Sequence, residues 1–190
     1  VEFETGVVFF LTGLSLWHAE LGIRNYELWD LIPILLIFII WSLLIAISAY
    51  DFRHKIIPNQ LVYPFILFSF LFPIPHTSYL ILLDVILLTF AGITGFAFFA
   101  SLWFVSHGRW MGFGDAKLAL GMGFLLGPWL TALAAVLSFW IGTLVAVPLV
   151  LLRGGGLKTQ IPFGPFLALS TFISWFAGTS LLDMYIRLLS

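Results

Sequence analysis

Residues 31–50 read LIPILLIFIIWSLLIAISAY, a run of 20 residues without a charged side chain. An α-helix needs about 20 consecutive apolar residues to cross the hydrocarbon core of a bilayer. The run therefore predicts a membrane-spanning helix. It ends where polar residues begin, in the segment DFRHKIIPN at residues 51–59.

The rest of the 190-residue chain has the same character, with 62% hydrophobic and only 9% charged residues. A soluble domain carries roughly 25% charged residues. This composition excludes an ordinary soluble domain, a disordered segment and a basic nucleic-acid-binding domain. We predict an all-α, polytopic transmembrane helical bundle that forms a single membrane-embedded domain over residues 1–190. The apolar runs predict about seven spans, at about 3–22, 31–50, 60–74, 79–105, 116–127, 129–152 and 161–182.

Some of these apolar runs have sharper boundaries than others. The first run, about 3–22, is the least regular because polar residues interrupt it. The fifth and sixth runs are separated by a turn predicted at Gly127-Pro128. Other glycines, at positions 92, 95, 121 and 123, place small residues on helix faces, which favours close helix packing.

The distribution of lysine and arginine predicts the orientation in the membrane. Short loops on the cytoplasmic side of a membrane protein carry an excess of these residues. Only two of the eight, Arg24 and Arg187, fall on one predicted side. The other side, which we expect to be cytoplasmic, holds Arg53, Lys55, Arg109, Lys117, Arg153 and Lys158.

Two acidic residues stand out because they share the predicted cytoplasmic boundary. Asp51 follows the second span and Asp115 precedes the fifth, whereas Asp84 lies near the outer end of the fourth. Two neighbouring carboxyl groups cannot both ionise cheaply, so one of them keeps a proton. Such a pair can activate a water molecule and polarise a peptide carbonyl. The alternative is that each is a loop aspartate near basic residues.

The residues before Asp115 favour the catalytic alternative. Gly112 and Gly114 flank Phe113 in a Gly-x-Gly-Asp pattern. Glycine permits close approach of another backbone, so an extended peptide could lie against this segment. Lys117 would add positive potential nearby.

Three segments together resemble the signature segments of bacterial type IV prepilin peptidases, which belong to the Gly-x-Gly-Asp intramembrane aspartyl proteases. They are DFRHKIIPN at 51–59, GFGDAKLA at 112–119 and IPFGPFLA at 161–168. The resemblance implies that Asp51 and Asp115 are the catalytic aspartates. It assigns the shaping of the site to Arg53, Pro58, Asn59, Gly112, Gly114, Lys117, Pro162, Phe163, Gly164 and Pro165.

The resemblance also implies an activity and a setting. The expected enzyme is an aspartic endopeptidase of the bacterial inner membrane, with its active-site loops in the cytoplasm. It would remove the short basic leader from type IV prepilins and type II secretion pseudopilins. We expect no cofactor, no metal and no nucleic-acid partner, and the oligomeric state stays open.

Members of this family also carry an additional N-terminal span and a cytoplasmic domain with Cys-x-x-Cys pairs, linked to N-methylation. This sequence contains no cysteine and begins at Val1 without a methionine. We therefore expect either a truncated protein or a peptidase-only member, and we do not expect methyltransferase activity from these residues. Two other functions remain open, a small proton-coupled transporter that uses Asp84 and an inactive assembly factor for pili or secretion.

Overall fold

The structure is a computed structural model that describes residues 28–72, 81–153 and 162–189. These residues form helices α2 (Leu28–His54), α3 (Asn59–Leu71), α4 (Ile81–Ser106), α5 (Phe113–Arg153) and α6 (Gly164–Leu189). No strand occurs among them, which confirms the all-α prediction for this part of the chain. The first predicted span, about 3–22, lies outside the described residues.

Three of the described helices are long and apolar enough to cross a membrane, namely Ile32–His54, Leu83–Ser106 and Phe113–Pro148. Lipid offers no hydrogen-bonding partner to the backbone, so a helix, which satisfies its own N–H and C=O groups, is the form expected there. Helix α3 is apolar but has only 13 residues. At about 1.5 Å per residue it is about 20 Å long, which is shorter than the ~30 Å hydrocarbon core.

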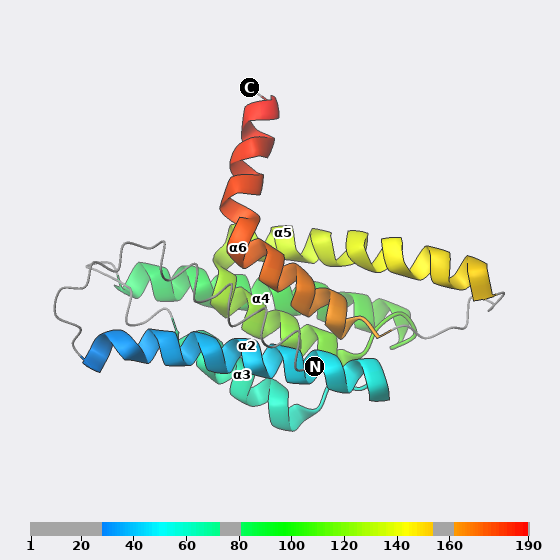
Figure 1. Ribbon diagram of the computed structural model, residues 1–190, viewed down its shortest axis with the longest axis horizontal. Coiled ribbons are helices and arrows are strands. Elements are labelled where there is room, and N and C mark those ends of the chain that lie inside the picture. The colour runs from blue at the N-terminus through cyan, green and yellow to red at the C-terminus, as the bar shows by residue number, and fades with distance from the viewer. Residues whose placement is uncertain (1–27, 73–80, 154–161, 190) are drawn as a thin grey trace.

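Helix α5 is broken at Gly127, where the backbone takes φ 73° and ψ 178°. This conformation is essentially restricted to glycine. Pro128 follows at the start of the second arm, a position that suits its fixed φ and missing N–H. Figure 1 shows that the two arms run in opposite directions. They correspond to the predicted spans 116–127 and 129–152, and the predicted turn between them is present.

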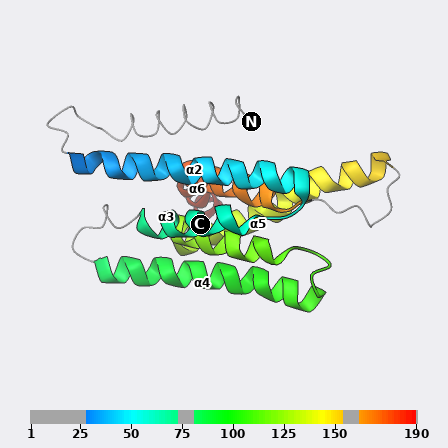
Figure 2. The ribbon, with the colours of Figure 1, turned by 90° about the horizontal axis from the view of Figure 1, so that it is seen from below.

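The polar segments gather at one end of the bundle, which we call the motif end. Here α2 and α4 finish and α3, α5 and α6 start, at the right of Figure 1 and again in Figure 2. The segments around Asp51, Asp115 and Gly164 therefore share one end. The sequence predicted that they would lie on one side of the membrane.

Helices α2 and α5, which carry the two aspartates, make very little contact with each other in the described part of the chain. Helices α3 and α6 each pack against both of them. On the α6 side, Trp41 of α2 packs edge-on against Phe172 and Trp175. On the α3 side, the Phe65 ring occupies the space that a side chain at Gly121 of α5 would need. The relative position of the two aspartates is thus set largely through α3 and α6.

Helix α4 packs directly on α5 through glycine. A Cβ atom added at Gly123 would overlap the backbone of Gly92, and one added at Gly92 would overlap the Phe124 ring. At Gly95 an added Cβ would lie 3.2 Å from the carbonyl oxygen of Ala119. The close packing expected from these glycines is therefore present.

Candidate active site

Asp51 lies in the last turn of α2 and is only 4% exposed. Its Oδ2 atom accepts a hydrogen bond of 3.0 Å from the backbone N–H of Gly164, the first residue of α6. The first N–H groups of a helix have no acceptor within the helix, and the positive end of the helix dipole favours an anion. A Cβ at position 164 would lie 2.6 Å from Oδ2, so this approach requires glycine.

Asp115 lies in the first turn of α5 and is 5% exposed. Its Oδ2 accepts a 3.1 Å hydrogen bond from the backbone N–H of Gly112, while its own N–H donates to the Gly112 carbonyl oxygen at 3.2 Å. This return of a side chain to the residue that precedes the helix is one half of a capping box. The same contacts therefore start α5 and fix the Asp115 carboxyl group.

Both aspartates lie at the motif end, in the last turn of α2 and the first turn of α5. Their carboxyl groups interact electrostatically with each other. Both are buried, and each has one oxygen held by a backbone N–H at the start of a helix. Two adjacent carboxyl groups, one ionised and one protonated, can together act as a general base and a general acid.

The two glycines of the Gly-x-Gly-Asp segment differ in how closely they pack against neighbouring residues. A Cβ at Gly114 would lie 2.7 Å from Cβ of Ile57, so this glycine lets the segment before α3 pack on the first turn of α5. Beyond its neighbours in the chain, the atom nearest to a Cβ at Gly112 would be Oδ2 of Asp115, 3.8 Å away. The sequence did not predict a role for Ile57, because its contact with Gly114 depends on how the helices pack.

Lys117 connects α5 to α3. Its Nζ donates to Oδ1 of Asn59 at 2.7 Å and to the hydroxyl of Tyr63 at 3.3 Å. The same ammonium lies 5.2 Å from the centre of the Tyr63 ring and 5.5 Å from that of Phe113. Lys117 and Asn59, predicted separately, thus meet directly. Tyr63 was missed, although it follows Asn59 by one helical turn and so shares its face.

The remaining predicted residues flank these contacts. Arg53 is exposed in the last turn of α2, where a cation suits the negative end of the helix dipole. Pro58 precedes α3, and its carbonyl oxygen accepts hydrogen bonds from the N–H groups of Leu61 and Val62.

On the α6 side, the Phe163 carbonyl oxygen accepts hydrogen bonds from the N–H groups of Phe166 and Leu167, so Phe163 caps the start of α6. Its ring lies 5.2 Å from that of Phe139 and 6.0 Å from that of Phe99, measured between centres. Pro162 and Pro165, on either side of the Phe163-Gly164 pair, are half-buried. This packing holds the Gly164 N–H in place for Asp51.

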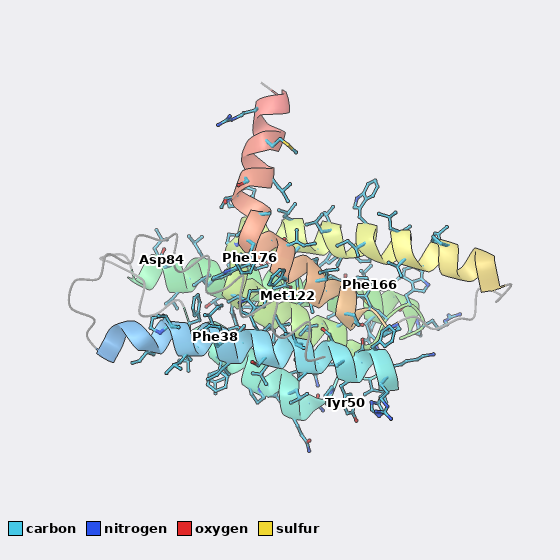
Figure 3. The ribbon with its side chains drawn as sticks, viewed as in Figure 1. Phe38, Tyr50, Asp84, Met122, Phe166 and Phe176 are labelled. Atoms are coloured by element: carbon cyan, nitrogen blue, oxygen red, sulfur yellow. The ribbon has the colours of Figure 1, made fainter. Side chains whose placement is uncertain are left out.

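Asp84 lies away from this site. It is in the first turn of α4, whereas the motif end holds the last turn. Figure 3 shows Asp84 at the opposite end of the bundle from Tyr50, the neighbour of Asp51. Among the described residues, no group of three or more His, Cys, Asp and Glu side chains is arranged to hold a metal ion.

Comparison with known proteins gives consistent matches. The model of the type IV leader peptidase family matches residues 36–147. A prepilin leader peptidase/N-methyltransferase of Bacillus subtilis is 30% identical, covering 90% of this chain and 65% of its own length. The protein of the same name from Pseudomonas aeruginosa is 29% identical, and the match covers 98% of this chain and 60% of the relative. The one from Aeromonas salmonicida is 28% identical, and the match covers 75% of this chain and 49% of the relative.

The matched region contains Asp51 and Asp115 but ends before Gly164. The chain spans about half to two thirds of the length of these curated relatives. No solved structure gives a significant match.

Proposed function

This chain belongs to the type IV leader peptidase family, and on that premise we propose that it is an intramembrane aspartyl endopeptidase with Asp51 and Asp115 as its catalytic dyad. The observation that supports the proposal is that both carboxyl groups are buried at the motif end and lie within electrostatic range of each other. They come from helices that barely touch, so the packing of the whole bundle is needed to bring them together.

In the proposed reaction, the ionised carboxylate takes a proton from a water molecule as this water attacks the scissile carbonyl carbon. The protonated carboxyl group donates its proton to the carbonyl oxygen. As the tetrahedral intermediate collapses, the first carboxyl group gives its proton to the leaving amine and the C–N bond breaks. The second carboxylate takes a proton from a hydroxyl group of the intermediate, which returns the dyad to its starting state. The N–H groups of Gly164 and Gly112 each hold one carboxyl oxygen, and in the proposed reaction the other oxygen of each aspartate acts on the water or the peptide.

The proposed substrates are type IV prepilins and type II secretion pseudopilins, which carry a short basic leader before an apolar helix. Such a leader stays in the cytoplasm while the apolar helix is held in the bilayer. The scissile bond is then at the cytoplasmic boundary. Asp51 and Asp115 suit this location because each lies near one end of an apolar helix. The proposed setting is the bacterial inner membrane, with about seven spans and the motif end facing the cytoplasm.

The test is cleavage of a purified prepilin in liposomes by the wild-type chain and by the Asp51→Asn and Asp115→Asn variants. Asparagine keeps the shape and an oxygen acceptor but cannot serve as the base. We expect cleavage after the leader by the wild type and none by either variant, with unchanged thermal unfolding. Asp84→Asn is the matched control, since Asp84 lies at the other end of the bundle.

Other results would favour the two remaining functions. A proton-coupled transporter would lose proton-dependent uptake into liposomes in the Asp84→Asn variant and keep it in the other two. An assembly factor would tolerate all three substitutions. Full cleavage by either the Asp51 or the Asp115 variant would contradict the proposed dyad.

A further inference from the structure

The contact between Lys117 and α3 has a consequence for the separation of the two aspartates. Asp51 and Asp115 are on α2 and α5, which make very little contact in the described part of the chain. Any fixed distance between them must be transmitted through α3 or α6. On the α6 side, the Gly164 N–H binds Asp51 directly.

On the α3 side, the contacts closest in sequence to Asp115 lie at the start of the two helices, and Phe65 against Gly121 continues the packing further along. Gly114 packs against Ile57, and Lys117 binds Asn59 and Tyr63. These two α5 residues lie on either side of Asp115 in the sequence. Ile57 belongs to the four-residue connection, 55–58, that joins α2 to α3.

That connection is short and tightly defined. The N–H of Lys55 donates to the carbonyl oxygen of Asp51 at 2.7 Å, and Lys55 takes a positive φ of 57° that ends α2. Pro58 then caps α3. A movement of the first turn of α3 is therefore passed to the last turn of α2, which carries Asp51.

We propose that Tyr63 is a positioning residue. Together with Asn59 it binds the Lys117 ammonium, and through this contact α3 fixes the separation of Asp51 and Asp115. Lys117 then acts as a tether between two helices rather than through its charge at the carboxyl groups. The ring of Tyr63 on α3 favours this, because a cation is attracted to the face of an aromatic ring, while the ring of Phe113 contacts the same ammonium from α5 itself. Only the kinetic part of this inference rests on the proposed function.

The structural part is tested by a distance measurement in the full chain. The sequence has no cysteine, so spin labels attach only where cysteine is introduced. Phe52 in the last turn of α2 and Trp110 before α5 are 75% and 73% exposed, which suits labelling. Pulsed electron resonance on the Phe52→Cys/Trp110→Cys chain measures the separation of the two segments.

We expect a narrow distance distribution that broadens in Lys117→Met and Tyr63→Leu. Lys117→Arg keeps a donor and a cation over the rings, so it should retain the narrow distribution. Lys55→Met is the matched control, because it removes a positive charge from the same end and leaves the grip on Lys117 intact. A distribution that stays narrow in both Lys117→Met and Tyr63→Leu would overturn the proposal.

The kinetic part uses the cleavage assay. A misplacement of about 1 Å costs up to about 100-fold in rate, so kcat should fall by tens of fold in Lys117→Met while KM changes little. Adding Asn59→Ala to Lys117→Met should cost almost nothing more, since the contact is already lost. Additive losses would overturn the tether. If the wild type cleaves nothing, the proposed function fails, and the distance measurement still decides whether Lys117 holds the helices together.

Discussion

The backbone N–H of Gly164 holds Oδ2 of Asp51 at 3.0 Å, although 113 residues separate them in the sequence. The contact places the start of α6 against the last turn of α2. It exists only because position 164 has no side chain.

Gly164→Ala should therefore damage the site. The added Cβ would lie 2.6 Å from Oδ2 of Asp51, so the carboxyl group or the start of α6 must move. We expect cleavage to fall by about 100-fold, the scale expected for a misplaced catalytic group. The measurement is kcat/KM on a prepilin in liposomes.

Gly142→Ala is the matched control for this change. Gly142 is also buried, and its added Cβ would meet nothing closer than 3.4 Å, a carbon of the Phe166 ring. Its activity should match the wild type. Equal activity of Gly164→Ala and Gly142→Ala would show that the approach of Gly164 to Asp51 is unimportant.

The two glycines before Asp115 should respond differently to alanine. Gly114→Ala places a methyl group 2.7 Å from Cβ of Ile57 and should lower the midpoint of thermal unfolding in detergent. Gly112→Ala has space and should unfold like the wild type. Any activity that Gly112→Ala loses would then report on a substrate backbone that lies close to this residue. Equal unfolding midpoints for the two variants would refute the distinction.

Gly127→Ala tests the break in α5. The site has room for a methyl group, since beyond the backbone of α5 itself the nearest atom is Cδ2 of Leu88, 3.7 Å away. The cost is conformational, because φ 73° with ψ 178° is nearly exclusive to glycine and imposes about 1–3 kcal/mol on other residues. Chemical unfolding in mixed micelles should show a loss of this size. No loss would mean that the two arms meet in a different conformation.

Gly123→Ala tests the contact between α4 and α5. The added methyl group would overlap the backbone of Gly92, which cannot move aside as a flexible side chain can. Overpacking of this kind costs about 1–3 kcal/mol. The control is Ala97→Leu, an enlargement at an exposed position of α4, which should leave stability unchanged. A stable Gly123→Ala variant would argue against direct backbone contact here.

The sequence predicted the helices well where the apolar runs are clear. The run at 31–50 lies within α2 (Leu28–His54), and the turn at Gly127-Pro128 is present because only glycine tolerates that backbone. The count of lysine and arginine put the three motif segments on one side, and they lie at one end of the bundle. Asp51 and Asp115 lie, as predicted, where one helix closes and the other opens, although α2 continues to His54 and α5 begins at Phe113, a few residues beyond the predicted spans.

The contacts within the site could not be predicted in the same way. That Gly164 donates to Asp51, and that Gly114 leaves room for Ile57, depend on how distant helices pack. Lys117 was expected to supply charge near Asp115, and the structure shows its ammonium bound to α3. The spacing of Asn59 and Tyr63 on one face of α3 was the only local signal of this contact.

The central claim is that Asp51 and Asp115 act as one catalytic unit. The most direct test compares prepilin cleavage by Asp51→Asn, Asp115→Asn and the double variant, all folded and in the same liposomes. Groups that act as a unit are strongly non-additive. We predict that each single variant falls to the background rate and that the double variant loses nothing further. A single variant that retains substantial cleavage, with a further loss in the double variant, would contradict the account.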